Sequence, residues 1–211
     1  MTRRVLDLLL PLGLGVGLGV GVGVEAGCRS ATSHYYTLVA ATDAAPAVAT
    51  NELQLDVLAV DVPPDVDRAE MVVRQGPGEL TPVETRSWIA PLSRELRRAF
   101  SDELSRDLGA RDISGVTPAD GVPTYRIKLV VQRFESVLGK RAVIDAISTV
   151  RDASGKSPAL VCSHHASEPA RAGYDGIAEA HQRALASIAK QIAASVRSFR
   201  EGPASCGPTA P

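Results

Sequence analysis

Cys28 is the residue whose surroundings most clearly suggest chemistry. It follows the small residues Ala26 and Gly27, and an apolar segment, Val5 to Val24, precedes them. In bacterial lipoproteins the chain is cut just before a lipidated cysteine in such a box. Glu25 stands where that box usually has an aliphatic residue. The alternative is a plain export signal followed by an ordinary cysteine.

The first 27 residues have the three-part layout of an export signal. Arg3 and Arg4 form a short positive region, the apolar segment follows, and the small residues of the cleavage context come last. A retained membrane helix is the alternative, since about twenty apolar residues can span a bilayer. Glycine occupies every second position from Gly13 to Gly23, and each glycine costs roughly 1 kcal/mol of helix propensity. The segment is therefore predicted to be a cleaved signal.

The other two cysteines, Cys162 and Cys206, could pair or stay reduced. An exported chain meets an oxidising compartment, where an odd number of cysteines requires an explanation. A lipid on Cys28 would leave two thiols. Because nothing fixes the path of the C-terminal segment, a buried and unpaired Cys162 is the prediction and a Cys162–Cys206 disulfide is the alternative.

Catalytic constellations are not apparent, so the sequence predicts no catalytic residue, no metal site and no cofactor. It has no Gly-x-Ser-x-Gly elbow and no phosphate-binding glycine loop. His164 and His165 are adjacent in an expected strand, so their side chains should point to opposite faces. Cys162 shares a face with His164, but no third group is suggested to orient such a pair. His181 lies in the apolar stripe of an expected helix and is predicted to be a hydrogen-bonded core residue.

Composition limits the classes of partner. The chain has 211 residues, 45% of them hydrophobic, which is enough for the core of one domain. The formal net charge is −1 and only 4% of the residues are aromatic. Nucleic-acid binding needs a basic patch and aromatic side chains for stacking. We therefore expect no nucleic-acid partner.

Alternating polar and apolar residues predict several strands, and the last three, joined by short turns, predict an antiparallel meander. The expected strands are Glu52–Val62, Met71–Arg74, Glu79–Glu84, Ile113–Thr117, Tyr125–Leu138, Arg141–Arg151 and Ala159–Ala166.

Helices are predicted over Ser87–Leu108 and Asp175–Phe199, each with one apolar stripe opposite a charged side. The expected fold class is α+β, a two-layer sandwich in which a mostly antiparallel sheet carries both amphipathic helices on one face. The expected organisation is a lipoprotein signal peptide (1–27), a lipidated tether and linker (28–51), a single domain (52–200) and a disordered tail (201–211).

A set of short motifs occurs in a particular order along the chain. They are Tyr35, Tyr36 and Leu38; Pro63, Asp67 and Arg68; Val72 and Arg74; Trp88 at the expected start of the first helix; and Arg133 with Phe134. In this order and spacing the sequence resembles the PqiC-type lipoproteins of the ABC-type transport auxiliary lipoprotein family. Two features depart from the pattern: Glu25 in the cleavage box, and the absence of a tryptophan from the second meander strand.

The resemblance implies an outer-membrane lipoprotein that faces the periplasm and is lipidated, by palmitate among other acyl chains, at Cys28. Such a protein would be a non-enzymatic auxiliary subunit of an MCE-type intermembrane lipid transport system that supports envelope integrity. Its implied partners are an MCE-domain protein with its inner-membrane permease, and further copies of the chain, arranged as a ring. Arg29 replaces the aspartate that usually retains lipoproteins in the inner membrane. The alternatives are a periplasmic hydrolase with an unrecognised site and a purely structural envelope lipoprotein.

The loop-rich segment Val62–Leu80 is the candidate partner interface. It holds Pro63, Asp67, Arg68 and Arg74, and loops on a rigid sheet commonly make partner contacts. The alternative is that Asp67 and Arg68 only lock a turn.

Overall fold

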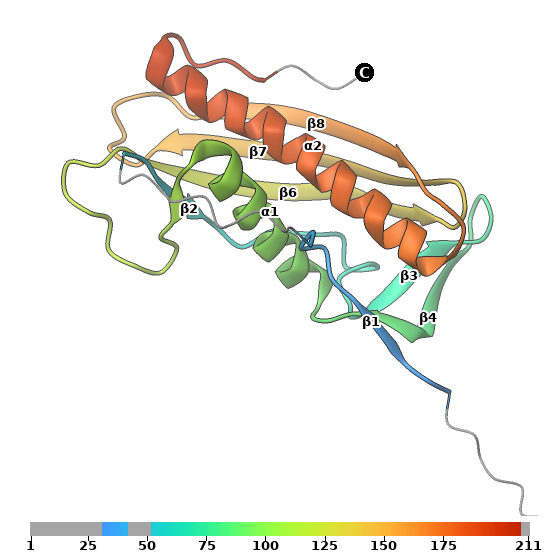
Figure 1. Ribbon diagram of the computed structural model, residues 1–211. Coiled ribbons are helices and arrows are strands. Elements are labelled where there is room, and N and C mark those ends of the chain that lie inside the picture. The colour runs from blue at the N-terminus through green and yellow to red at the C-terminus, as the bar shows by residue number, and fades with distance from the viewer. Residues whose placement is uncertain (1–30, 42–51, 208–211) are drawn as a thin grey trace, which may run out of the picture. The chain divides into compact units, whose positions relative to one another are not determined.

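Three long antiparallel strands form the centre of the structure: β6 (Thr124–Val137), β7 (Arg141–Asp152) and β8 (Leu160–Pro169). The computed structural model describes residues 31–41 and 52–207 (Figure 1). The predicted signal peptide, Cys28, most of the linker and the last four residues lie outside the described residues. The predicted meander is confirmed, and its strands begin and end within a few residues of the expected positions.

Two short strands extend this sheet. β2 (Gln54–Val57) runs parallel to β6, and β5 (Arg111–Asp112) runs parallel to β2, so the order is β5-β2-β6-β7-β8. The strand expected over Ile113–Thr117 is wrong. The Ile113 amide donates to the Leu55 carbonyl, but the Val116 amide then donates back to the Ile113 carbonyl, and this turn ends the pairing.

A second, three-stranded sheet departs from the single sheet that the sequence suggested. It consists of β1 (His34–Tyr36), β4 (Leu80–Trp88) and β3 (Glu70–Arg74), in the order β1-β4-β3. β3 and β4 form an antiparallel hairpin, whereas β1 runs parallel to the end of β4. β3, which lies in the candidate interface segment, and β1, which lies within the predicted tether and linker 28–51, therefore belong to the same small sheet.

The two helices, α1 (Leu92–Leu108) and α2 (Gly173–Glu201), lie side by side on one face of the larger sheet (Figure 1). The predicted α+β class with both helices on one face is confirmed. The predicted start of the first helix at Ser87 is wrong, because β4 continues through Trp88 and the helix begins only after Pro91. Ile89, expected on the buried stripe, is 58% exposed.

The core lies between the helices and the inner face of the larger sheet. Each helix buries its apolar stripe, which includes Leu96 and Phe100 in α1, and Ile188 and Ile192 in α2. The sheet contributes alternate residues such as Ile127, which is fully buried. Burial of this kind contributes about 25 cal/mol for each Å² of apolar surface removed from water.

Candidate partner interface

The loop that carries Pro63, Asp67 and Arg68 is bonded to the start of α1. The Pro63 carbonyl accepts hydrogen bonds from the amides of Val66 and Asp67, which closes a turn. The Leu92 amide donates to the Arg68 carbonyl at 3.3 Å. This loop is therefore a support for the helix as well as an exposed segment.

Asp67 acts as a remote cap of α1. Its Oδ1 accepts a hydrogen bond from the Ser93 amide at 3.0 Å, whereas Pro91, at the cap position itself, offers no side-chain hydrogen bond. The first amides of a helix have no partner within the helix, and a carboxylate there also interacts favourably with the helix dipole. This role is more than the simple turn lock that the sequence suggested as the alternative.

Replacing Asp67 with Ala should lower the free energy of unfolding by about 1 kcal/mol, because the Ser93 amide loses its acceptor. Urea unfolding at neutral pH measures the difference. Asp65→Ala is the matched control, since it removes a neighbouring carboxylate that, within the described part of the chain, accepts no hydrogen bond from α1. Equal losses in the two variants would contradict the capping role.

Arg68 has an exposed side chain. Its guanidinium donates to Glu70 Oε2 at 3.0 Å, and 44% of the side-chain surface remains exposed. This hydrogen bond lowers the pKa of the Glu70 carboxyl below its ordinary value. Because exposed ion pairs contribute little to stability, Arg68 can be replaced with little effect on the fold.

Arg74 points instead to a carboxylate that the sequence analysis did not single out. Its Nε donates to Glu135 Oε2 at 2.5 Å, and Arg133 donates to Glu135 Oε1 at 2.7 Å. Arg141 lies 3.6 Å from the same Oε1. Three guanidiniums from β3, β6 and β7 thus surround the carboxylate of Glu135, whose side chain is only 6% exposed.

Burial alone would raise the pKa of Glu135, but the hydrogen bonds from Arg74 and Arg133 outweigh it, and the pKa is lowered. Glu135 is therefore ionised at neutral pH. The ion-pair cluster ties the β3–β4 hairpin to the end of the long strands.

A cleft of about 190 Å³ opens beside this cluster. Pro63 and Arg74 line it together with Phe134 and Glu135, whereas Asp67 and Arg68 do not. The structure thus brings two of the four predicted interface residues to one cleft and places the other two at the start of α1.

Phe134, which lines the cleft, and Trp88 are motif residues of the family resemblance, and they form an aromatic cluster with His181. The rings of Phe134 and His181 stack with centroids 3.9 Å apart, and Trp88 meets both rings edge-on. His181 Nε2 lies 2.8 Å from Ser136 Oγ. Burial lowers the pKa of His181 to about 3, so the ring is neutral. The predicted core role of His181 is confirmed, and Trp88 ends β4 where it was expected to open the helix.

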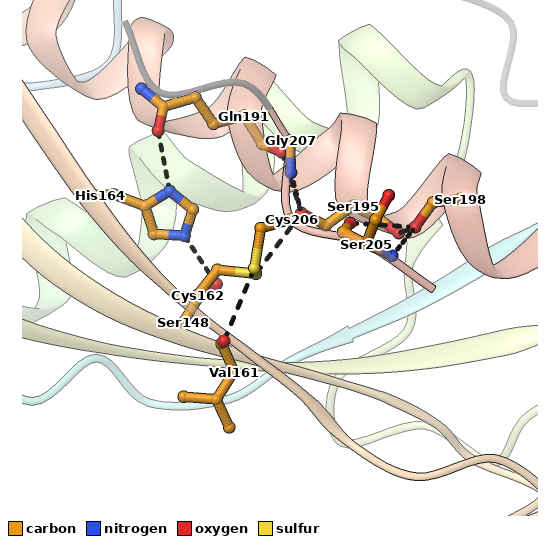
Figure 2. Close-up of a disulfide and its surroundings, with 10 residues drawn as sticks. All are labelled: Ser148, Val161, Cys162, His164, Gln191, Ser195, Ser198, Ser205, Cys206 and Gly207. Atoms are coloured by element: carbon orange, nitrogen blue, oxygen red, sulfur yellow. Dashed lines mark hydrogen bonds between the residues drawn. A yellow bond between two sulfur atoms is a disulfide. The ribbon is translucent and has the colours of Figure 1, made fainter. Parts of the chain in front are cut away.

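The C-terminal cysteines are paired, contrary to the prediction of an unpaired Cys162. A disulfide joins Cys162 in β8 to Cys206, which follows α2 (Figure 2). Where the composition predicted a disordered tail from Glu201, the chain turns back after α2 and is described as far as Gly207. The cysteine count could have favoured this pairing, because a lipid on Cys28 leaves only Cys162 and Cys206 to pair.

Beside the disulfide, His164 bridges Ser148 and Gln191 (Figure 2). Its Nε2 lies 2.8 Å from Ser148 Oγ, and its Nδ1 lies 2.9 Å from Gln191 Oε1. Burial lowers the pKa of His164, and the hydrogen bond to Gln191 only partly opposes it. The arrangement Ser148–His164–Gln191 resembles the Ser-His-Asp triad of a hydrolase. Its third residue, however, is an amide where the triad has a carboxylate, and Ser148 is fully buried. His165 points to the other face, as predicted, and bonds Asp145.

Within residues 31–41 and 52–207, no helix is long and apolar enough to cross a membrane. The same part of the chain contains no group of three or more histidine, cysteine, aspartate or glutamate side chains placed to hold a metal ion.

Comparison with known proteins gives a family match and a shared fold. The family model described as "ABC-type transport auxiliary lipoprotein component" matches residues 36–193. A crystal structure of protein XCC0632 from Xanthomonas campestris is 20% identical, with a TM-score of 0.59 over 81% of this chain and 98% of that one. A second structure, described as an uncharacterized protein, is 20% identical, with a TM-score of 0.62 over 78% of this chain and 99% of that one. No curated protein matches the sequence.

Proposed function

The chain belongs to the ABC-type transport auxiliary lipoprotein component family, and from this premise we propose that it is a non-enzymatic auxiliary subunit of an intermembrane lipid transport system. Cys28 carries the lipid and anchors the domain to the periplasmic face of the outer membrane. The observation that carries the proposal is the family match, which runs from β1 to the second half of α2.

The disulfide supports this assignment of Cys28. The chain has three cysteines, and Cys162 pairs with Cys206, so Cys28 is the one that this disulfide leaves over. Structural disulfides persist in oxidising compartments such as the periplasm. Export and a lipid-bearing Cys28 together account for all three cysteines.

A short tether would hold one end of the domain near the membrane. His34, the first residue of β1, is six residues after Cys28, and six extended residues span at most about 20 Å. β1 pairs with β4 and β4 with β3, so the small sheet holds the first element of the domain that follows the anchor along the chain. The loop that carries Pro63, Asp67 and Arg68 leads directly into β3 of this sheet.

The partner in this proposal is an MCE-domain protein with its inner-membrane permease. Copies of the chain form a ring, because a partner that is itself a ring is best matched by a symmetric set of subunits. Pro63, Asp67, Arg68 and Arg74 form the contact region. Asp67 and Arg74 also support the fold, so their substitution would mix two effects, and Arg68 is the cleaner probe.

Arg68→Ala should weaken recovery of the MCE-domain protein in a pull-down at least about fivefold, the effect of losing about 1 kcal/mol at an interface. The melting temperature should be nearly unchanged, because an exposed ion pair contributes little. Co-purified lipid, measured by mass spectrometry, tests the transport role.

Arg98→Ala is the matched control for this experiment, since Arg98 is an exposed arginine on α1 outside the contact region. If Arg68→Ala and Arg98→Ala recover the partner equally well, the proposed contact region is wrong. If the wild-type protein recovers neither an MCE-domain protein nor lipid, the structural-lipoprotein alternative is favoured over the transport role.

A further inference from the structure

The C-terminal strap, residues 203–207, lies along the seam between α2 and β8. The Ser205 amide donates to Ser198 Oγ at 2.9 Å, and Ser198 Oγ donates to the Ser205 carbonyl at 3.1 Å. The Gly207 amide donates to Ser195 Oγ at 3.0 Å. The disulfide from Cys206 adds a covalent link to β8 in the middle of these bonds (Figure 2).

The seat of the strap is shaped for this segment. A Cβ atom on Gly207 would lie 2.2 Å from the Gln191 carbonyl oxygen and 3.0 Å from Ala194 Cβ. The first distance is far below a van der Waals contact, and the helix backbone cannot give way cheaply. The strap is therefore a fitted part of the fold, held against α2 by contacts that any side chain at Gly207 would disturb.

The two cysteines of the disulfide differ in exposure. Cys162 faces the core side of β8 and is 2% exposed, with its Sγ 3.9 Å from Ser195 Oγ. Cys206 lies on the strap and is exposed. Thiol–disulfide exchange requires a thiolate to reach one sulfur, and access decides which sulfur is attacked.

We propose that Cys206 is a thiol-exchange site for a dithiol oxidoreductase and that its disulfide latches the strap over the α2–β8 seam. In the opening direction, a thiolate of the dithiol attacks Cys206 Sγ, the bond to Cys162 breaks, and Cys162 leaves as a thiolate and takes a proton. The second thiol of the dithiol, as a thiolate, then attacks the sulfur of the first dithiol cysteine in the mixed disulfide. Cys206 is released as a thiolate and takes a proton. Two electrons pass from the dithiol, which becomes a disulfide, and the reverse sequence closes the latch.

Opening should change the seam without unfolding the domain. His164 remains bonded to Ser148 and Gln191, and α2 remains packed on β7 and β8. A neighbouring hollow of about 460 Å³ is lined by Pro203 and Ala204 of the strap together with residues that include Phe199 and Leu160. Release of the strap takes Pro203 and Ala204 out of this lining and leaves the Ser195 hydroxyl without its bond from Gly207.

The first test uses the wild-type folded chain and glutathione as a monothiol probe, followed by acid quenching and mass spectrometry of the peptides. Glutathione should be found on Cys206 in at least about tenfold excess over Cys162, because Cys206 is the exposed cysteine and Cys162 is buried. Equal labelling, or labelling mainly at Cys162, would overturn the assignment of Cys206.

The second test measures hydrogen exchange with and without dithiothreitol. The amides of Ser205 and Gly207 should exchange at least about tenfold faster after reduction, while the amides of β6 to β8 keep their protection, because local opening precedes global unfolding. Unchanged protection at Gly207 would show that the disulfide does not hold the strap. Loss of protection throughout the sheet would show that the disulfide supports the whole fold and is no latch.

Gly207→Ala should speed the reduction of the disulfide by dithiothreitol by about tenfold, because the added Cβ lifts the strap from α2 and widens the approach of a thiolate to Cys206 Sγ. Gly202→Ala is the matched control: its Cβ would meet nothing within 4 Å, and its φ of 169° is extended backbone. Equal reduction rates in the two variants would contradict the fitted seat. Ellman titration under native conditions gives the rates.

Discussion

The Cys28→Ser variant should be recovered from the soluble fraction, whereas the wild-type protein should be recovered almost entirely with membranes. Each buried methylene of an acyl chain contributes about 0.8 kcal/mol, so several chains on one cysteine hold firmly where a single chain binds only marginally. A serine hydroxyl at position 28 would not receive the lipid. Fractionation followed by immunoblotting measures the change, and a metabolically incorporated labelled fatty acid should mark only the wild-type chain.

Cys206→Ser is the matched control for this prediction, because it removes a cysteine that belongs to the disulfide. It should remain with the membrane. Mass determination of the N-terminus must show that the signal peptide has been cleaved from Cys28→Ser. If the cleaved variant still sediments with membranes, the lipid assignment is wrong and another element holds the protein there.

Strong local patterns predicted the central strands and both helices. Residues of β6 alternate over a long stretch, and the apolar residues of α2 recur with a helical period, so local sequence was sufficient. The same reasoning failed at Ser87, where Ile89 and Leu92 have a helix-like spacing. There the backbone pairs with distant segments: the Ile89 amide donates to the Tyr36 carbonyl, and the Trp88 amide donates to the Ala69 carbonyl.

The candidate site was predicted only in part for a similar reason. Arg74 was chosen for its place in the loop-rich segment, but its partner Glu135 is 61 residues away and looked like an ordinary polar residue of a strand. The disulfide closes a separation of 44 residues, and Cys206 lies in the tail, 201–211, which is rich in glycine and proline. Such pairings depend on tertiary contacts, which a single sequence does not reveal.

The ion-pair cluster around Glu135 leads to the second large effect. Replacing Glu135 with Gln should lower the free energy of unfolding by about 2–4 kcal/mol at neutral pH, because three guanidiniums lose their shared anion while the amide keeps nearly the same shape. Urea unfolding measures the difference. Glu70→Gln is the matched control, since Glu70 is a more exposed carboxylate with a single arginine partner, and it should shift the unfolding midpoint only slightly.

The difference between wild type and Glu135→Gln should depend on pH in a defined direction. The folded state lowers the pKa of Glu135, so the folded protein binds this proton less readily than the unfolded chain. The stability that the carboxylate contributes is therefore complete above the unfolded pKa and is lost as the pH falls through the folded pKa. Unfolding measured from pH 7 down to about pH 3 should show the two proteins converging below about pH 4. A constant difference across that range would mean that Glu135 acts through packing and not through its charge, and the cluster would then lose its role as the electrostatic link between the β3–β4 hairpin and the long strands.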